Sequence, residues 1–342
     1  MSGRPTWTYG AGIIGYHALA VAALLPYFFS WSGVVTALLG VFVFGTLGIN
    51  LCYHRLLTHR GLICPKWFEH SLAILGVCSV QDTPAHWVSV HRRHHQHSDK
   101  QPDPHSPLAG LLWSHMGWLL LENRELGRLG IYQRYAKDIL ADPFYAALER
   151  RGRWVQIVLL SWIVFFVAGF VGAAAMGSNL PDAFRIGMSL LIWGVFVRTV
   201  VVWHITWSVN SFAHVWGYQR YETGEASRNN LIVGYLSNGE GWHNNHHADP
   251  RSARHGHVWW ELDVTWLTIR LLGALGLARR VATPRRALMD QATGKRATMP
   301  NLRHSLLRRD ARTPAFGKVS AVQVRHCGVI SDNILDRRPA KR

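Results

Sequence analysis

Long apolar stretches alternate with polar, histidine-rich stretches along this chain of 342 residues. Four of the apolar stretches are long enough to cross the hydrocarbon core of a bilayer as helices. They are residues 10–31, 33–52, 154–176 and 186–209. Only short links join the first to the second and the third to the fourth, so each pair is predicted to form a hairpin. The pattern predicts an all-α integral membrane protein with four transmembrane helices.

The polar segments between and after these stretches are predicted to form a helical cap outside the membrane, made of residues 54–153 and 210–282. Within the cap, residues 67–90 are moderately apolar but contain several polar side chains and a proline. A re-entrant or surface helix pair is therefore predicted there rather than a further span. Residues 283–342 are basic, polar and without periodicity, which predicts a flexible tail that carries no chemistry.

The charge distribution orients the chain in the membrane. The formal net charge is +17. Apolar stretches of this length exclude a nucleic-acid-binding protein, so the positive charge is interpreted as an orientation signal and as contact with anionic lipid of the bilayer. The short links hold at most Arg185, whereas the termini and the cap are rich in Lys and Arg. The positive-inside rule therefore places both termini and the cap on the cytoplasmic side of a multi-pass protein, as expected in a bacterial inner membrane.

Histidines recur at a spacing that puts them on one face of a helix. The pattern His-x-x-His-His occurs at His91, His94 and His95 and again at His243, His246 and His247. Residues at i, i+3 and i+4 lie on one helical face. Two such clusters on the same predicted side of the membrane are difficult to explain by packing. They predict a metal site.

The ligand types narrow the choice of metal. Imidazole suits Fe, Zn, Cu and Ni. No Cys-x-x-Cys pair is present, which argues against structural zinc, and neither the His-Glu-x-x-His pattern nor Glu-x-x-His repeats occur. The clusters offer more imidazoles than one metal needs, so two metals are predicted. Two irons would suit activation of dioxygen.

A third cluster, His54-Arg-Leu-Leu-Thr-His59, follows the second apolar stretch directly. The second helix is therefore predicted to continue past the bilayer and to carry this cluster into a polar environment. On an α-helix, residues five apart are separated by about 140°. The two histidines are expected either to serve two metals or to be separated by the end of the helix.

The other histidines are given simpler roles. Lone histidines are more often surface or hydrogen-bonded core residues than ligands, and His17, His70, His304 and His326 are placed in that class. A second set lies nearer the clusters and is expected to support the site or the fold. These residues are His86, His97, His105, His115, His204, His255 and His257.

Taken in order, the motifs resemble those of the membrane fatty acid desaturase family, of the bacterial stearoyl/acyl-CoA Δ9 type. The resemblance extends from about residue 10 to residue 280. It is carried by His54-Arg-Leu-Leu-Thr-His59-Arg60, His91-Arg-Arg-His94-His95, Asp103-Pro-His105, Ser114-His-Met-Gly-Trp118, Asn210-Ser-Phe-Ala-His214 and Gly239-Glu-Gly-Trp-His243-Asn-Asn-His246-His247.

The resemblance implies a site, a reaction and a fold. It implies two iron ions held by nine histidines: His54, His59, His91, His94, His95, His214, His243, His246 and His247. Asn210 matches a position that contacts one metal through a water molecule. The implied reaction uses O₂ and two electrons to introduce a cis double bond, at Δ9, into a saturated acyl chain. The implied fold has four membrane helices under a cytosolic cap that holds the irons.

A bent apolar tunnel is also implied, because an alkyl chain offers no polar group by which one pair of methylenes could be selected. Gln81, Trp87 and Thr206 match residues that shape the bend of the family's tunnel, and Trp203 and Trp207 lie nearby in the sequence. Core or interfacial packing is the alternative explanation for the tryptophans.

The acyl carrier is left open by departures from the animal acyl-CoA enzymes. Ser89 replaces an arginine, Asp82 aligns with an asparagine used for the CoA head group, and Glu122 and Asn123 replace a basic pair. These changes remove cationic contacts that a phosphate-rich CoA would use. Acyl-CoA, acyl-lipid and an acyl group on a carrier protein all remain candidate substrates.

Electrons are expected to come from a separate protein. No His-Pro-Gly-Gly haem motif of a fused cytochrome b5 domain is present. A ferredoxin or a cytochrome b5-like donor with its reductase is expected, and a basic face would attract an acidic donor.

Two alternative functions remain from the sequence. One is a di-iron acyl or alkane hydroxylase on the same scaffold. The other is a membrane metal transporter, although transporters place ionisable residues within the spans near the midplane of the bilayer. Product analysis distinguishes the first alternative from a desaturase, and O₂ consumption distinguishes the second.

Overall fold

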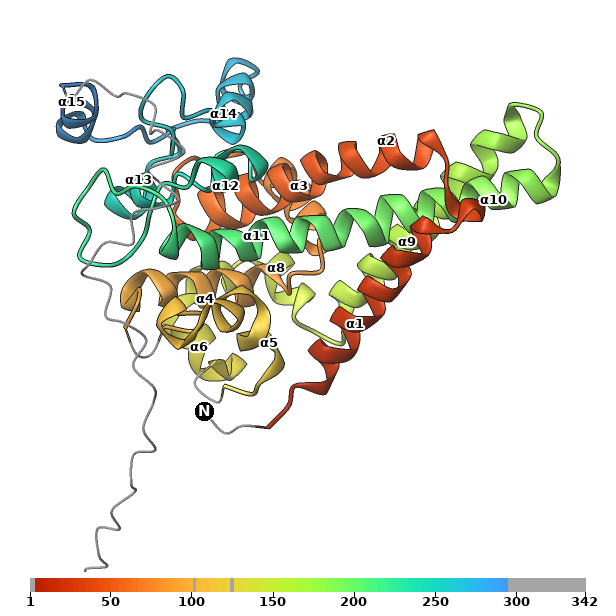
Figure 1. Cartoon of the computed structure of the whole chain (residues 1–342), viewed down its shortest axis with the longest axis horizontal. Coiled ribbons are helices and arrows are strands. Elements are labelled where there is room, and N and C mark those ends of the chain that lie inside the picture. The colour runs from red at the N-terminus through yellow and green to blue at the C-terminus, as the bar shows by residue number, and fades with distance from the viewer. Residues whose placement is uncertain (1–3, 101–102, 124–125, 295–342) are drawn as a thin grey trace, which may run out of the picture.

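The computed structural model describes residues 4–100, 103–123 and 126–294. Helices joined by loops make up this part of the chain, and its only β-structure consists of isolated bridges. Figure 1 shows the helices of the elongated half, which are α1 (Trp7–Val21), η1 (Ala22–Leu24), η2 (Pro26–Phe28), α2 (Trp31–Gly40), η3 (Val41–Thr58), α9 (Arg153–Ala175), α10 (Leu180–Leu191), η7 (Ile192–Val197) and α11 (Arg198–Val215).

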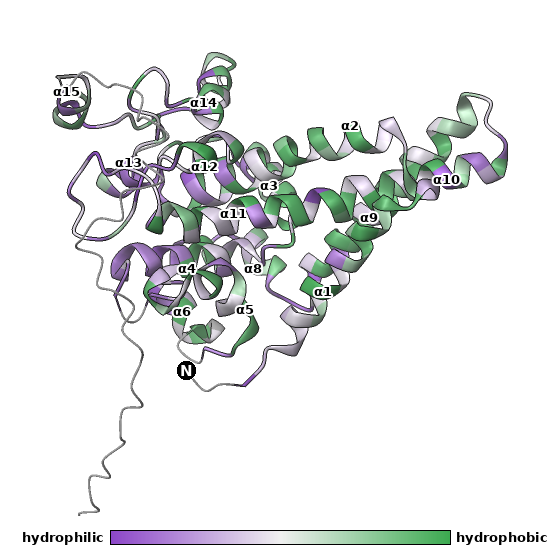
Figure 2. Ribbon diagram, in the orientation of Figure 1, coloured by the Kyte–Doolittle hydropathy of each residue, from purple (hydrophilic) through white to green (hydrophobic). Residues whose placement is uncertain are grey.

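The other helices gather at one end of this elongated half and form a cap (Figure 1). They are α3 (Lys66–Val77), α4 (Pro84–His97), η4 (Pro107–Ala109), η5 (Trp113–Gly117), α5 (Trp118–Leu120), α6 (Arg128–Tyr135), α7 (Lys137–Leu140), α8 (Pro143–Leu148), α12 (Leu231–Leu236), α13 (His243–Ala248), α14 (Val264–Ala274) and α15 (Arg286–Gly294). Figure 2 shows that apolar residues dominate the elongated half and that polar residues gather on α4, α13 and the loops around them.

Three helices of the described chain are long and apolar enough to cross a membrane: Trp31–Thr58, Arg153–Ala175 and Leu180–Val215. They contain three of the four predicted spans. The first predicted span, residues 10–31, is different, because α1 has only 15 residues. A helix of that length measures about 22 Å, which is less than a hydrocarbon core of about 30 Å. The chain continues as η1 and η2 to Phe28.

The break between η1 and η2 has a local cause. Leu25 precedes Pro26 and has an extended backbone, with φ −75° and ψ 131°. A proline disfavours the helical conformation of the residue before it, so the two short turns cannot join into one α-helix. The sequence predicted a kink or an end at Pro26, and the α-helix ends several residues earlier, at Val21.

Two of the long helices continue past their predicted ends. The helix that contains α2 and η3 reaches Thr58, and α11 reaches Val215. His54 and His214 are therefore carried on rigid continuations of membrane helices. This agrees with the expectation that the second helix continues beyond the apolar stretch.

The cap is packed closely against η3. Gly48 lies against the backbone of Gly76 in α3, since a Cβ on Gly48 would lie 2.6 Å from the Gly76 nitrogen. The ring of Tyr53 fills the space next to Gly76 in the same way. Small residues here let the two helices approach at backbone distance.

The predicted helix pair in residues 67–90 is present as α3 and α4. The start of α4 follows from its sequence, because Thr83 accepts a hydrogen bond from the His86 amide and Pro84 occupies the first turn. Part of the predicted tail is also helical. Residues 286–294 form α15, and Leu288 and Ala292 pack on a cluster that contains Tyr221 and Trp242. Residues 295–342 lie outside the described residues.

Candidate metal centre and adjoining cavity

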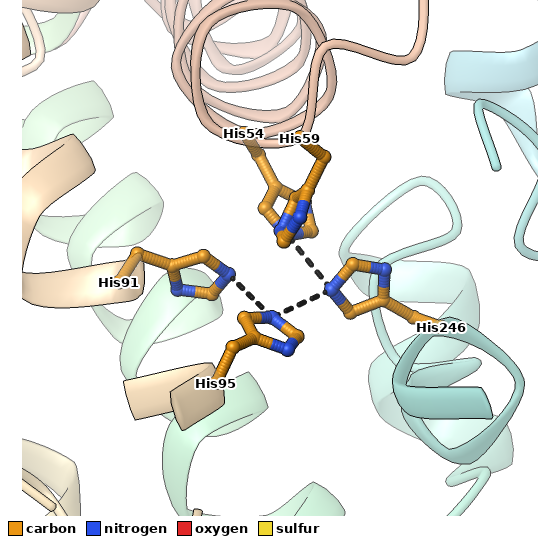
Figure 3. Close-up of side chains that lie close together, drawn as sticks. All are labelled: His54, His59, His91, His95 and His246. Carbon is orange, nitrogen blue, oxygen red and sulfur yellow. Dashed lines mark hydrogen bonds between the residues drawn. The ribbon is translucent and has the colours of Figure 1, made fainter. Parts of the chain in front are cut away.

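The nine histidines singled out in the sequence form two groups at the junction of the membrane helices and the cap. The first group consists of His54, His59, His91, His95 and His246 (Figure 3). The second group consists of His94, His214, His243 and His247. In each group one nitrogen from every side chain lies within 4.8 Å of the others, an arrangement that could hold a metal ion.

Each His-x-x-His-His cluster contributes to both groups. On α4, His91 and His95 belong to the first group and His94 belongs to the second. On α13 the assignment is reversed, since His246 belongs to the first group and His243 and His247 to the second. The pair at i and i+4 shares a group each time, and the remaining histidine lies beside the other group. The double histidine of the motif thus connects two neighbouring sites.

His54 and His59 lie in the same group because η3 is wound as a π-helix. The His59 amide donates to the His54 carbonyl at 3.1 Å, a bond between residues five apart. The ring centroids of the two residues are 4.8 Å apart. The helix does end just before His59, as one of the two expectations allowed. The 140° separation assumed an α-helix, however, and does not apply here.

The contacts between imidazoles have the spacing expected for ligands of one ion. Nε2 of His246 lies 3.1 Å from Nε2 of His54 and 3.0 Å from Nε2 of His95 (Figure 3). In the second group, Nε2 of His243 lies 3.0 Å from Nε2 of both His214 and His247. With metal–nitrogen bonds of about 2.1 Å, adjacent ligands of an octahedral ion are separated by about 3.0 Å.

Carboxylates hold four of these rings from the opposite side. His54 Nδ1 lies 2.6 Å from Glu240. In the second group, the Nδ1 atoms of His94, His214 and His247 lie 3.1, 3.2 and 3.5 Å from Asp103, Asp99 and Glu225. A carboxylate at Nδ1 fixes the proton there and leaves the Nε2 lone pair directed inward, which is the usual support of a metal-binding histidine.

These carboxylates were not assigned a role from the sequence. Asp103 and Glu240 lie within motifs that carried the family resemblance, so a signal was present. Asp99 and Glu225 lie in none of these motifs, and Asp99 reaches His214 from more than one hundred residues away in the sequence.

A buried cation supports the first group. Arg55 is 1% exposed and donates to Glu240 at 2.9 and 3.0 Å and to Asp263 at 2.9 and 3.0 Å. Glu240 in turn faces His54. Burial raises the pKa of Glu240, but Arg55, His54 and His255 together outweigh burial and hold that pKa well below its usual range.

Burial keeps most of the cluster neutral. Burial first, and then the neighbouring imidazoles, lower the pKa values of His59, His91, His95, His243, His246 and His247 well below their usual range. Burial also lowers the pKa of His94, but Asp103 reverses the effect and leaves it raised. Neutral imidazoles present the lone pairs that a metal requires.

The nitrogen atoms without partners also fit a metal. Nε2 of His94 and Nε2 of His59 are buried and have no hydrogen-bond partner within the described chain. A buried polar atom without a partner costs about 1–3 kcal/mol. A metal ion in each group would bind both nitrogens. The histidines present therefore fit the two iron ions predicted from the sequence.

Among the histidines given simpler roles, two lie beside the metal-binding groups and one lies elsewhere in the cap. The His255 ring lies 4.5 Å from His246, and the His105 ring lies 4.4 Å from His94, so both border the groups as expected. Burial, and then His94, lower the pKa of His105 to about 3. His70 is bound to Asp142 at 3.0 Å in the cap, and His304 and His326 lie outside the described residues.

His17, His204 and His115 form a hydrogen-bonded chain apart from the two groups. Nε2 of His17 lies 3.0 Å from Nε2 of His204, and Nδ1 of His204 lies 3.0 Å from Nε2 of His115. The ends are the Ile13 carbonyl, 2.7 Å from His17, and the Ser211 hydroxyl, 3.0 Å from His115. This chain joins α1 and η5 to α11. Nothing in the sequence indicated that these three residues meet.

A cavity of about 460 Å³ adjoins the histidine groups. His54, His91, His105 and His243 lie on its wall together with Asn210. The volume is in the range of sites that enclose a small organic ligand. Most of the remaining wall is apolar and comes from α1, α11, and α4 with the segment before it.

All five side chains predicted for a tunnel line this one cavity: Gln81, Trp87, Trp203, Thr206 and Trp207. Gln81 donates to the Thr206 hydroxyl at 3.0 Å and accepts from the Trp87 indole at 3.4 Å. The Trp203 indole donates to the Ser79 carbonyl at 2.8 Å. The polar atoms of Gln81, Trp87, Trp203 and Thr206 are thus hydrogen-bonded within the protein.

A comparison with protein families decides the identity of the chain. The family model for fatty acid desaturases matches residues 14–276, which include both histidine groups and the cavity. The chain belongs to the fatty acid desaturase family.

Three curated desaturases illustrate the range of similar proteins. The sn-1 stearoyl-lipid 9-desaturase of Anabaena variabilis is 42% identical over 80% of this chain and 93% of its own length. The sn-1 stearoyl-lipid 9-desaturase of Synechocystis sp. is 41% identical over 82% of this chain and 81% of its own length. The icosanoyl-CoA 5-desaturase of Limnanthes douglasii is 38% identical over 81% of this chain and 73% of its own length.

The desaturase family establishes the class of activity. The chain is an oxidoreductase of lipid metabolism, a membrane fatty acyl desaturase that introduces a double bond. The histidine groups are compatible with the iron that this family generally requires. Neither the hydroxylase nor the transporter considered from the sequence is favoured by these similarities.

Proposed function

We propose that this desaturase is an O₂-dependent acyl-lipid 9-desaturase in which each histidine group holds one iron ion. The observation that carries the proposal is the convergence of nine imidazoles, in two groups, beside a cavity lined by apolar residues. An alkyl chain in that cavity would lie against both groups.

Nine histidines would be the iron ligands, five in the first group and four in the second, and Asn210 would contact the second group through a water molecule. Iron supplies the oxidising chemistry that activates O₂, which side chains cannot provide. The balanced reaction converts a –CH₂–CH₂– unit, O₂, two electrons and two protons into a –CH=CH– unit and two water molecules.

The protein's own part is to select and bend the acyl chain. A methylene has no polar group for the protein to bind, so position along the acyl chain is set by the shape of the cavity. Gln81, Trp87 and Thr206 are linked by hydrogen bonds and would hold the wall where the chain bends. Trp203 and Trp207 stack with a centroid separation of 5.6 Å and extend that wall. A bend held in this way favours a cis product.

An acyl-lipid is the better-supported carrier. The relatives include lipid and CoA enzymes, and those of Anabaena variabilis and Synechocystis sp. are named as acting on stearoyl-lipid. Ser89 is fully buried and donates to the Ala85 carbonyl at 2.7 Å, so it offers no contact to a phosphate. Asp82 lines the cavity as a carboxylate paired with His86 at 3.0 Å. A polyphosphate such as CoA would be repelled there.

Electrons would come from a separate ferredoxin or a cytochrome b5-like protein with its reductase. The formal net charge of +17 would attract an acidic donor. Reduction rates that do not change with salt concentration would contradict electrostatic docking.

The proposed topology has four membrane helices, with α1, η1 and η2 together as the first. The three long apolar helices support this arrangement. Both termini and the cap would face the cytoplasm, as the positive charge of the cap favours, because Arg185 is the only basic residue in the short hairpin links. The protein would then be a multi-pass protein of a bacterial inner membrane, with the cavity accessible from the bilayer.

Expression followed by fatty-acid analysis of the lipids tests the proposal. The wild type is expected to accumulate a cis-9 monounsaturated chain, and His94→Ala is expected to produce none and to contain less iron. His97→Ala is the matched control, because His97 is on the same helix and belongs to neither group. A hydroxylated chain without an alkene, or full activity of His94→Ala, would contradict the proposal.

A further inference from the structure

The two histidine groups differ in the negative charge that supports them. Three of the four histidines in the second group have a carboxylate at Nδ1, from Asp99, Asp103 and Glu225. Only one of the five histidines in the first group, His54, has such a contact among the described residues.

The carboxylates of the second group are not compensated by a cationic side chain of the described residues. Within the described chain, no Lys or Arg forms an ion pair with Asp99, Asp103 or Glu225. Main-chain amides hold them instead, since Asp99 accepts from the Ala226 amide at 2.7 Å and Asp103 accepts from the Asp99 amide at 3.0 Å. Three negative charges therefore support four ligands.

The single carboxylate of the first group is compensated. Arg55 lies between Glu240 and Asp263, so the three groups together carry one negative charge. The first group thus has five histidines and one net negative charge beside them, whereas the second group has four histidines and three carboxylates.

This difference acts on the oxidation state of a bound metal. A carboxylate at Nδ1 makes an imidazole a stronger donor, and a stronger donor stabilises the more highly charged ion. Both groups are buried, where charges are poorly screened and their effect is larger than in water. Negative charge around a metal therefore lowers its reduction potential.

We propose that the second group holds its iron at a lower reduction potential than the first group, so that the first group accepts the first electron. The inference rests on the proposed function, because it requires one iron in each group. Each step is the transfer of one electron to Fe³⁺ to give Fe²⁺, with no bond formed or broken. Asp99, Asp103 and Glu225 are positioning residues that act through their histidines.

A reductive titration of the full chain tests the inference. The protein is purified with ⁵⁷Fe, oxidised, and titrated with dithionite while Mössbauer spectra report each iron. The wild type is expected to show two steps, with one iron reduced before the other. Asp103→Asn and Glu225→Gln are expected to raise the reduction potential of the later step only. Glu240→Gln is expected to raise the reduction potential of the earlier step only.

Asp142→Asn serves as the control, because Asp142 is an acidic residue of the cap that contacts His70 and Lys66 rather than either group. It should leave both steps unchanged. Two irons that reduce together in the wild type would overturn the inference, and so would an Asp103→Asn variant in which the earlier step moves.

The controls separate this inference from the proposed function. Iron content is measured for every variant, and the wild-type titration alone decides whether two potentials exist, even if a variant loses iron. A preparation that binds fewer than two irons, or makes no double bond, contradicts the proposed function. Two irons with a single potential, together with normal product, contradict only the inference.

Discussion

Individual contacts determine which atoms of the site face inward. The imidazoles of His94 and His54 each have a carboxylate at Nδ1, so their Nε2 atoms point toward the other ligands. Hydrogen bonds also orient the cavity wall, since Gln81 accepts from the Trp87 indole and donates to the Thr206 hydroxyl. Single substitutions at these contacts therefore have specific consequences.

Thr206→Val is expected to change where the double bond is placed. The substitution removes the acceptor of the 3.0 Å bond from Gln81 while keeping the size of the side chain. Losing a hydrogen bond of about 1 kcal/mol would let the wall shift and would change the ratio of positional isomers about fivefold. Gas chromatography of the products measures the ratio. Thr268→Val, in α14 and outside the cavity, should keep the wild-type ratio.

Asp142 gives the cap a stability that depends on pH. Burial raises its pKa, but bonds from His70 and Lys66, each at 3.0 Å, lower it from an ordinary value of 3.8 to about 2. Because the folded pKa is depressed, this stabilisation is present above about pH 4 and is lost as the pH falls toward 2. Thermal unfolding of the wild type and Asp142→Asn in detergent should differ at pH 6 and converge near pH 2. A difference that persists at pH 2 would contradict this account.

At the scale of helices, close approach and winding place the ligands. The π-winding of η3 aligns His54 with His59, and the contact of η3 with α3 fixes that helix against the cap. Gly48 is the closest point of this contact, and the atom that it faces is backbone, which cannot rotate away.

Gly48→Ala is therefore expected to destabilise the protein by about 1–3 kcal/mol, the usual cost of overpacking. The added methyl group would lie 2.6 Å from the Gly76 nitrogen. Gly172→Ala is the matched control, because it lies in the long helix α9 with no atom within 4 Å of the new methyl group. The unfolding midpoint in detergent measures both. Equal midpoints for the two variants would show that the helices do not pack this closely.

The sequence predicted those elements whose signal is local. The i, i+3, i+4 spacing of His91, His94 and His95 indicated a shared helical face, and apolar length indicated three long helices correctly. The division of each cluster between two groups was not predictable, because it depends on where α13 lies. The π-winding was not predictable either, since residues five apart point in different directions on the α-helix that the pattern assumes. Glu225 required a fold to bring it near His247.

At the scale of the whole molecule, two long helices connect the apolar half to the cap. The helix that contains α2 and η3 and the helix that ends with α11 carry ligands at their cap ends, while other residues of α11 line the cavity. The position of the metal site relative to the bilayer is thus set by helix length. Every proposed ligand and cavity residue precedes α15.

A chain that ends after Gly294 is therefore expected to keep its iron and its activity. Truncation after residue 285 should be less stable, because it removes Leu288 and Ala292 from the cluster with Tyr221 and Trp242. Iron content, product analysis and unfolding midpoints of the two truncated chains measure the effect. Loss of product in the longer truncated chain would assign a role to the basic segment.

The chain of His17, His204 and His115 has a consequence that follows from counting protons. The Ser211 hydroxyl at one end of this chain is also hydrogen-bonded to the Trp207 carbonyl at 2.8 Å. The extended chain has five hydrogen bonds, and the carbonyls of Ile13 and Trp207 at its ends can only accept. Three neutral imidazoles and the Ser211 hydroxyl supply only four protons, so one of the five bonds must be open when the chain is neutral. One added proton closes every bond. A neutral chain therefore holds α1 and η5 to α11 with four of these five bonds.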